Sequence, residues 1–262
     1  MNKLLLFDLD GTLLRTDKTI SEKTLAQLER CRQKNCRIGV STSRGEQNCL
    51  SFIGQLRPDV LIASGGALVK KREQIIYKAV FTPERSRELI QIAREICGET
   101  VEITMDTLNG HYWNYKNAPR ESDQSWGDSI WTDFHDFSEE TLKMCVEIFD
   151  EEKAKQLTER LVDCDAARFS DGQWYQYTRA GVTKEHAIDV VCQNCNMMPQ
   201  EIIAFGDDFA DIGMLRMAGI GVAMGNAVDE VKAIADVVIG KNDEDGIAEY
   251  LRGMEDLDGS LS

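Results

Sequence analysis

Two aspartates separated by a single residue follow an apolar run at the start of the chain. The run is Leu4–Phe7, and the residues after it are Asp8, Leu9, Asp10, Gly11 and Thr12. Carboxylates at the end of a buried strand cost desolvation free energy unless a cation or hydrogen-bond donors compensate them. The segment therefore favours a buried strand that ends in a site for a metal ion or a nucleophile. An acidic turn is the alternative interpretation, because Asp and Gly are common turn residues.

Three more polar clusters each follow an apolar, strand-like run. They are Ser41–Arg44, Thr183–Lys184 and Gly206–Asp211. Ligands of open α/β sheets bind at the carboxyl ends of the strands, so we expect these clusters to meet the two aspartates in one site. The alternation of strand-like and helical patterns predicts an α/β fold whose core is a doubly wound, mainly parallel, Rossmann-like sheet.

Two helix starts are predicted from residues that commonly cap helices. Ser21 precedes an amphipathic segment that runs to Asn35, and Thr183 precedes another. Lys184 then lies in the first turn of a helix, where the positive end of the helix dipole favours phosphate. We expect the acidic C-terminal residues 253–262 to be frayed.

Acids, hydroxyls and a lysine in one site are typical of phosphoryl transfer. Mg²⁺ is commonly held by one or two carboxylates, and Asp8 and Asp207 are the natural pair. A lysine and a threonine hydroxyl can hold the phosphoryl oxygens. One aspartate can act as a covalent nucleophile while the other protonates the leaving oxygen and later activates water.

At these residues the chain resembles the haloacid dehalogenase superfamily of phosphatases, and more closely its Cof-type branch with a large inserted cap. The resemblance covers residues from near 1 to 80 and from near 180 to 250. The four motifs of the family correspond to Asp8–Thr12, to Thr42, to Lys184, and to Gly206–Asp207 with Asp211. The segment Gly221–Ala227 is also similar to the usual continuation of this branch.

The resemblance implies that Asp8 is the nucleophile and that Asp10 is the general acid and base. It also implies that Thr42 and Lys184 hold the phosphoryl group and that Asp8, Asp207 and the main-chain carbonyl of Asp10 bind Mg²⁺. We also expect Ser43 to bind the phosphate, Asp211 to be a metal ligand, and Thr12, Arg44 and Asn226 to support the site.

Three residues depart from the pattern of the family. Ala210 stands where the fourth motif has asparagine, Ser43 where the second has glycine, and Gly65 where the branch has asparagine. None of them replaces a proposed nucleophile, acid or metal ligand. They favour altered geometry around the metal ligands and reduced activity, and they keep a non-catalytic member open as an alternative.

Residues 82–179 hold none of the four clusters and differ in composition. All four tryptophans of the chain lie there, at positions Trp113, Trp126, Trp131 and Trp174. Helical patterns at 84–96 and 151–161 alternate with strand-like runs at 101–105, 144–149 and 174–177, which predicts an inserted α+β cap. The catalytic core domain would then comprise residues 1–81 and 180–262. We expect most cap aromatics to fill the cap's own core, and His111 to lie in a solvated turn beside Gly110.

Composition narrows the possible partners. The net charge of −15 repels nucleic acids and anionic membranes, so neither is expected as a partner. No apolar stretch approaches the length of a membrane span, and the N-terminal segment is predicted to be a core strand rather than a cleavable signal.

We expect a cytoplasmic protein whose eight cysteines are reduced, with Cys192 and Cys195 as packing thiols rather than a redox or zinc motif. The sequence says nothing about oligomeric state.

These observations predict a magnesium-dependent phosphatase that hydrolyses a small phosphorylated metabolite, such as a sugar phosphate or phosphorylated cofactor, through an aspartyl-phosphate. A phosphotransferase or phosphomutase would share the intermediate but pass the group to another hydroxyl. A phospholigand-binding protein without catalysis is the alternative from another class. The leaving group and the cap residues that select it are not readable from the sequence.

Overall fold

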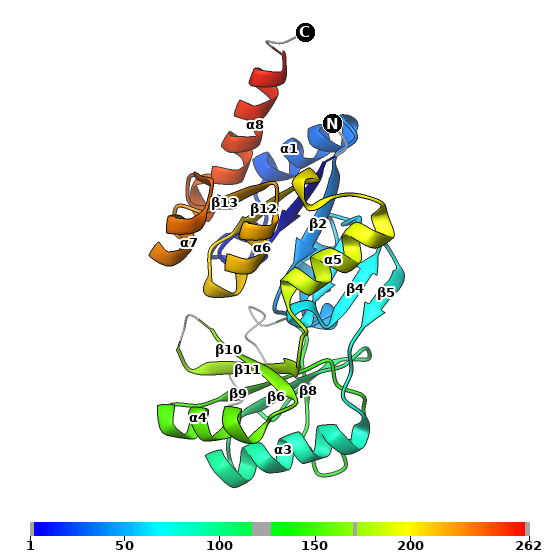
Figure 1. Cartoon of the computed structure of the whole chain (residues 1–262), viewed down its shortest axis with the longest axis vertical. Helices are drawn as coiled ribbons and strands as arrows, with labels where there is room; N and C mark the ends of the chain where they lie inside the picture. The colour runs from blue at the N-terminus through cyan, green and yellow to red at the C-terminus, as the bar shows by residue number, and fades with distance from the viewer. Residues whose placement is uncertain (1–2, 117–126, 170–171, 260–262) are drawn as a thin grey trace.

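Two sheets, each flanked by helices, follow one another along the long axis of the molecule (Figure 1). The computed structural model describes residues 3–116, 127–169 and 172–259. The larger sheet has eight strands, in the order β14 (Val237–Val238), β13 (Ile220–Ala223), β12 (Ile202–Gly206), β1 (Leu4–Phe7), β2 (Arg37–Ser41), β3 (Val60–Ala63), β4 (Leu68–Lys71) and β5 (Gln74–Lys78).

The centre of this sheet is parallel and buried on both faces. All four residues of β1 are buried, and β1 pairs in parallel with β12 on one side and with β2 on the other. Strands buried on both faces read as continuous apolar runs, which is why Leu4–Phe7 was recognisable as a strand. Pairing is parallel from β14 to β3, whereas β4 and β5 extend the sheet as antiparallel strands. The carboxyl ends of β1, β2 and β12 therefore meet at one edge.

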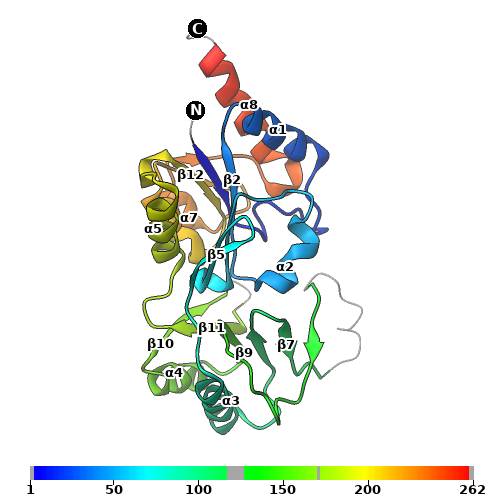
Figure 2. The ribbon, with the colours of Figure 1, turned by 90° about the vertical axis from the view of Figure 1, so that its right-hand side faces the viewer.

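Helices cover both faces of the larger sheet (Figure 2). On one side lie α1 (Glu22–Gln33), α2 (Glu46–Ile53) and α8 (Gly246–Gly259), and on the other lie α5 (Lys184–Cys195) and α7 (Asp229–Ile234), with α6 (Ile212–Met217) packed against both α5 and α7. The Ser21 hydroxyl accepts a hydrogen bond from the Thr24 amide, and the Thr183 hydroxyl accepts one from the His186 amide. Both predicted N-caps are therefore confirmed.

The smaller sheet is formed by residues of the insert. Its six strands have the order β10 (Cys164–Arg168), β11 (Trp174–Arg179), β9 (Lys143–Glu147), β6 (Ile103–Asp106), β7 (His111–Trp113) and β8 (Ile130–Trp131). Pairing is antiparallel except between β7 and β8. Two helices, α3 (Pro83–Cys97) and α4 (Glu151–Arg160), pack on it through an apolar cluster that includes Leu89, Ile103 and Leu157. We call residues 82–179 the cap.

The α/β fold class with a mainly parallel core sheet and α+β elements in the insert is confirmed. Strands β7, β8 and β10 and the β4–β5 hairpin were not predicted, because their sequences lack a long apolar run. The expectation of a frayed C-terminus is wrong as far as Gly259, because α8 continues to that residue. Among the cap tryptophans, Trp113 and Trp174 are buried and Trp131 is exposed, while Trp126 lies outside the described residues.

All eight cysteines are among the described residues, and none of them forms a disulfide. Cys192 and Cys195 are both buried in the core of the larger sheet, as expected for packing thiols. In the part of the chain that the structure describes, no helix has the length and apolar character needed to cross a membrane.

Candidate active site

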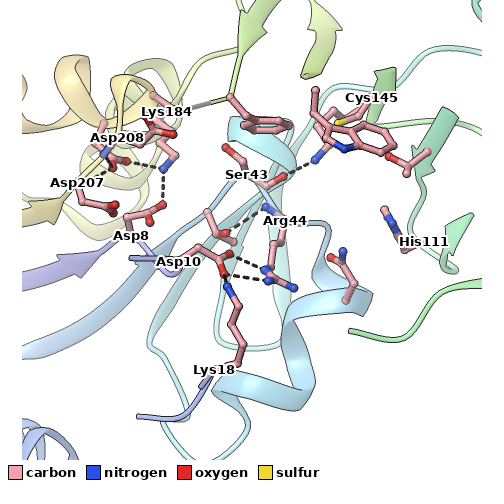
Figure 3. A pocket seen from close by; sticks show the side chains of 18 of the residues that line it. Asp8, Asp10, Lys18, Ser43, Arg44, His111, Cys145, Lys184, Asp207 and Asp208 are labelled. Carbon is pink, nitrogen blue, oxygen red and sulfur yellow. Dashed lines mark hydrogen bonds and ion pairs between the residues drawn. The ribbon is translucent and has the colours of Figure 1, made fainter. Parts of the chain in front are cut away.

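The four polar clusters predicted from the sequence come together at the carboxyl edge of the larger sheet. They line a cavity of about 400 Å³ that the cap completes from the opposite side. Figure 3 shows Asp8, Asp207 and Lys184 gathered at one end, Asp10 and Arg44 next to them, and His111 and Cys145 at the far end. The volume lies within the range of small-molecule sites.

Lys184 joins three segments of the core at one end of the cavity. Its ammonium lies 2.8 Å from Asp8 Oδ1 and 2.7 Å from Asp211 Oδ1, and it donates to the main-chain carbonyl of Ser41 at 3.1 Å. Burial by itself would lower the pKa of Lys184, but the charges of Asp211 and Asp8 outweigh it and raise the pKa. The lysine therefore stays protonated beside Asp8.

Asp207 is held by the loop that follows β1, which contains Gly11 and Thr12. The Thr12 hydroxyl donates to its Oδ1 at 2.6 Å, and this threonine is buried. Gly11 has φ +78°, and a Cβ atom there would lie 2.2 Å from Asp207 Oδ2. Only glycine therefore allows the loop to approach the carboxylate so closely.

Asp8, Asp207 and Asp211 form a cluster in which one ligand atom from each lies within 4.8 Å of the others. Burial raises the pKa of Asp207 to about 7, against the hydrogen bond from Thr12, and burial together with the charge of Asp211 raises the pKa of Asp8. Three carboxylates around a single ammonium leave excess negative charge in a buried place. Oxygen ligands with this excess charge suit a hard divalent cation such as Mg²⁺.

Within the cluster, Asp211 differs from the other two carboxylates. Its Oδ1 accepts from Lys184, and its Oδ2 accepts from the backbone amides of Asp207 and Asp208 at 3.0 and 3.1 Å. Both oxygens thus already hold protein donors and fix the loop that carries Asp207. Asp8 and Asp207 keep more capacity for a cation.

Asp10 points away from this cluster. Arg44 donates to both of its oxygens, at 2.6 and 2.9 Å, and Lys18 donates to Oδ1 at 2.7 Å. Burial would raise the pKa of Asp10, but the hydrogen bonds and charge of Arg44, with those of Lys18, outweigh it and lower the pKa. The guanidinium of Arg44 also stacks over the ring of Phe52, 4.8 Å from its centroid, which fixes the bidentate contact.

Thr42 and Ser43 form the turn that follows β2. Thr42 is buried, and its hydroxyl accepts a hydrogen bond from the Arg44 amide at 3.1 Å. Both residues line the cavity. On the other side of the turn, the carbonyl of Ser43 accepts a hydrogen bond from Lys143 of the cap.

Residues 5–251 match the sequence profile of the haloacid dehalogenase-like hydrolases. The chain belongs to this family. The resemblance seen in the motifs is thereby confirmed, and the aspartates, threonine and lysine of those motifs are the residues that the fold brings to one cavity.

Named relatives in this family match along nearly the whole chain. The 5-amino-6-(5-phospho-D-ribitylamino)uracil phosphatase YitU of Bacillus subtilis is 26% identical over 260 residues, which cover 95% of this chain and 96% of YitU. The HMP-PP phosphatase of Klebsiella pneumoniae is 28% identical over 246 residues, 89% of this chain and 88% of that protein. The solved structure of a HAD subclass IIB sugar phosphatase has a TM-score of 0.83 at 28% identity, over 97% of this chain and 99% of that one.

The three departures from the family pattern have different surroundings. Ala210 lines the cavity in the loop between Asp207 and Asp211. Ser43 contributes its carbonyl to the contact with the cap. Gly65 has φ +68°, and a Cβ atom there would lie 3.2 Å from the side-chain amide of Gln176 in β11. Two of the three departures thus lie where the core loops meet the cap.

Asn226 supports the first loop rather than the cavity. Its side-chain amide donates to the carbonyl of Gly11 at 2.7 Å, and its oxygen accepts from the Asn242 amide at 3.0 Å. This contact ties the loop of the aspartates to the segment after β13, which agrees with a supporting role.

Sequence reasoning missed the cap side of the cavity. The expectation that His111 lies in a solvated turn is wrong, because the ring is buried in β7 and bonded to Asp106. Asp106 also pairs with Lys143 at 3.0 Å, and both are buried. The hydrogen bond from Lys18 to Asp10 was also not predicted. Only the alternation of polar and apolar residues in Ile103–Asp106 hinted that a polar side chain of the cap points inward.

Proposed function

We propose that this protein is a magnesium-dependent phosphatase that hydrolyses a small phosphorylated metabolite through a phosphorylated Asp8. The observation that carries the proposal is the buried contact of Asp8 with Lys184, 2.8 Å long, beside the carboxylate of Asp207 in a cavity of about 400 Å³. Membership of the hydrolase family and the phosphatase names of its relatives support it. The relatives' names differ in substrate, so they support the reaction rather than one metabolite.

In the proposed reaction, a carboxylate oxygen of Asp8 attacks phosphorus and displaces the alcohol oxygen of the substrate. Lys184 faces the phosphoryl group from the first turn of α5, where the helix dipole adds positive potential, and the Thr42 hydroxyl donates to a second phosphoryl oxygen. In the same step Asp10 protonates the leaving oxygen. It then takes a proton from a water molecule that attacks the phosphorus of phosphorylated Asp8, so that inorganic phosphate is released and the Asp8 carboxylate is regenerated. In the structure, Arg44 holds Asp10 in the lining of the cavity.

The residues that would hold Mg²⁺ are Asp8 and Asp207, together with the main-chain carbonyl of Asp10, and Asp211 would support them by holding Lys184 and the Asp207 loop. When bound, the ion supplies positive charge to the phosphoryl oxygens. The excess of carboxylates over ammonium groups is the feature of this site that fits such a cation.

We further propose that residues 1–81 and 180–262 form the catalytic core domain and that residues 82–179 form a separate cap domain. The two sheets divide the chain in this way, and a bridge between Phe81 and Thr141 lies at the first junction. A cytoplasmic location would agree with eight cysteines that form no disulfide among the described residues.

A phosphate-release screen tests the proposed reaction. Purified protein with Mg²⁺ is incubated with acetyl phosphate, sugar phosphates and phosphorylated cofactors, and inorganic phosphate is measured. We expect release by the wild type and none by Asp8→Asn, whereas the matched variant Asp136→Asn, at a fully exposed position, keeps wild-type activity. Loss of substrate without inorganic phosphate would favour a phosphotransferase or mutase. Binding of phosphorylated ligands without any turnover would favour the non-catalytic alternative.

A further inference from the structure

The far wall of the cavity, opposite Asp8, is formed by cap residues of two kinds. Trp113, Trp174 and Phe169 provide apolar surface, and His111 and Lys143 provide polar groups. The two indoles meet edge to face with centroids 5.9 Å apart, and the Trp113 nitrogen donates to Glu102 at 3.2 Å, so the rings are held in place. A leaving group bound to phosphorus at Asp8 must face this wall.

The wall offers no uncompensated positive charge. Lys143 is the only cation among the cavity-lining cap residues in the described part of the chain. Its ammonium lies 3.0 Å from Asp106 Oδ2 and also donates to the carbonyl of Ser43. A second phosphate or a carboxylate on the leaving group would therefore lose its hydration without gaining an ion pair.

Asp106 determines which nitrogen of His111 carries the proton, and therefore which nitrogen can accept a hydrogen bond. Burial would raise the pKa of Asp106, but the charge of Lys143 and the contact with His111 outweigh it and hold the pKa well below its usual range. The carboxylate therefore accepts from Nδ1 of His111 at 2.6 Å, which places the proton on Nδ1. Among the described residues, Nε2 has no hydrogen-bond partner, and the ring lines the cavity.

The carboxylate itself has little freedom to move. The Ser64 hydroxyl donates to Asp106 Oδ2 at 3.1 Å. A Cβ atom on Gly45 would lie 2.7 Å from Asp106 Cγ, so the core loop after β2 packs directly on it. His111 is thus oriented by contacts that come from both the cap and the core.

We propose that His111 is a specificity-determining residue, whose Nε2 accepts a hydrogen bond from a hydroxyl group of an uncharged leaving group that packs against Trp113 and Trp174. The inference rests on the proposed phosphatase function and adds the chemistry of the leaving group. Asp106 acts as a positioning residue, because it holds the ring and its tautomer without touching the substrate.

Substrates that differ in their leaving groups test this inference. The leaving group of acetyl phosphate has no hydroxyl group, fructose 6-phosphate offers uncharged hydroxyls, and fructose 1,6-bisphosphate adds a second phosphate. We expect the wild type to have a higher kcat/KM for fructose 6-phosphate than for the bisphosphate. In His111→Leu, the ratio of kcat/KM for fructose 6-phosphate to that for acetyl phosphate should fall about tenfold, which corresponds to one lost hydrogen bond.

Two further variants separate recognition from stability. His111→Gln, whose side-chain oxygen can take the place of Nε2, should restore part of the ratio, and His135→Leu at an exposed position should leave it unchanged. An unchanged ratio in His111→Leu, a preference for the bisphosphate, or hydrolysis of acetyl phosphate without any of fructose 6-phosphate would overturn the inference and leave the phosphatase proposal standing. Absence of turnover with every phosphate ester, acetyl phosphate included, would overturn both.

The tautomer can be measured without activity. The chain has three histidines, so ¹⁵N-labelled histidine gives few signals and His111→Leu identifies the one of interest. Long-range ¹H–¹⁵N correlation spectra of the wild type should show the His111 ring protonated at Nδ1 and not at Nε2. A ring protonated at Nε2 would contradict the assigned acceptor.

Discussion

Lys184 and Arg44 each hold one of the two aspartates that follow β1, and the two carboxylates are thereby given different properties. Burial and neighbouring acids raise the pKa of Asp8, whereas Arg44 and Lys18 lower that of Asp10. Asp8 lies beside the ammonium of Lys184, and Asp10 lies beside Arg44 and Lys18. The two carboxylates thus lie in different electrostatic environments, although they are separated by a single residue.

Conservative substitutions of these two aspartates should have different effects. Asp8→Asn should abolish turnover while phosphate mimics such as vanadate still bind, because an amide does not attack phosphorus. Asp10→Asn should form the phosphoenzyme slowly from acetyl phosphate and then accumulate it, because no base activates water. Mass spectrometry of the intact protein after quenching measures the added phosphoryl group. Equal residual turnover in both variants would contradict the assignment of Asp8 as nucleophile and Asp10 as general acid and base.

Substitution of Ala210 tests how the absence of the family's asparagine from this chain affects the site. An amide at this position in the Asp207–Asp211 loop could orient the metal ligands, and such outer contacts are worth about tenfold to a hundredfold in metal affinity or activity. Ala210→Asn should therefore raise kcat or lower the Mg²⁺ concentration needed for half activity. Magnesium titrations of initial rate for both proteins provide the comparison. If the substitution only slows a fast enzyme, other contacts already orient this loop.

The loops after β1, β2 and β12 are short and are held by neighbours rather than by their own sequence. Thr12 reaches from the first loop to Asp207, and Asn226 reaches back to Gly11. The loop after β2 depends on the cap, because the carbonyl of Ser43 is bonded to Lys143. Strands β6 and β9 therefore help to position the turn of Thr42 and Ser43 through the Asp106–Lys143 pair.

Breaking that pair should cost stability in a defined pH range. The pKa of Asp106 is lowered from 3.8 and that of Lys143 is raised from 10.5, so the stabilisation is complete between these unfolded values. It is lost as pH falls through the folded pKa of Asp106 or rises through that of Lys143. Asp106→Asn should lower the free energy of unfolding by about 3–5 kcal/mol at pH 7, because Lys143 is left buried and uncompensated.

Urea unfolding of the wild type and of Asp106→Asn, at pH 7 and at decreasing pH, measures the difference in their free energies of unfolding. This difference should become smaller below pH 3.8. Asp136→Asn serves as the exposed control. Asp106→Asn combined with Lys143→Met should be more stable than Asp106→Asn alone, because no uncompensated charge remains. A difference that stays constant to low pH would rule out the ion pair as its source.

The cavity is lined by residues of both sheets and their loops. In the proposed function, the core would bind the phosphoryl group and the cap would supply the wall that faces the leaving group. Such an arrangement would let the cap select substrates without altering the residues proposed to bind phosphate. Because three carboxylates gather at the core end of the cavity, we expect a divalent cation to bind there.

Magnesium should stabilise the folded protein in the absence of substrate. At a concentration 100 times the dissociation constant, binding adds about 2.7 kcal/mol, which corresponds to several degrees in Tm. The shift should be smaller at pH 6 than at pH 8, because the pKa of Asp207 is about 7 and protons compete for this carboxylate below that value. Thermal unfolding with MgCl₂ or with EDTA measures the effect. Asp207→Asn should lose most of the shift, and an equal shift in this variant would place the ion elsewhere.

The central strands of the larger sheet, and the polar residues that follow them, were predictable from local sequence patterns. Leu4–Phe7 and Ile202–Phe205 are apolar throughout because central parallel strands are buried on both faces, and the polar residues after them mark the edge where ligands bind. The N-caps at Ser21 and Thr183 were predictable for the same reason, since a cap bonds within its own first turn.

The cap side of the site depended on contacts between distant residues. His111 lies beside Gly110 and resembles a turn residue, yet it is buried because β6, β7 and β9 pair and bring Asp106 and Lys143 together. The contact of Lys143 with Ser43 spans 100 residues and requires both sheets to be packed. Local patterns report hydrogen bonding and burial within a few residues, whereas partners of buried charges are set by how whole sheets meet.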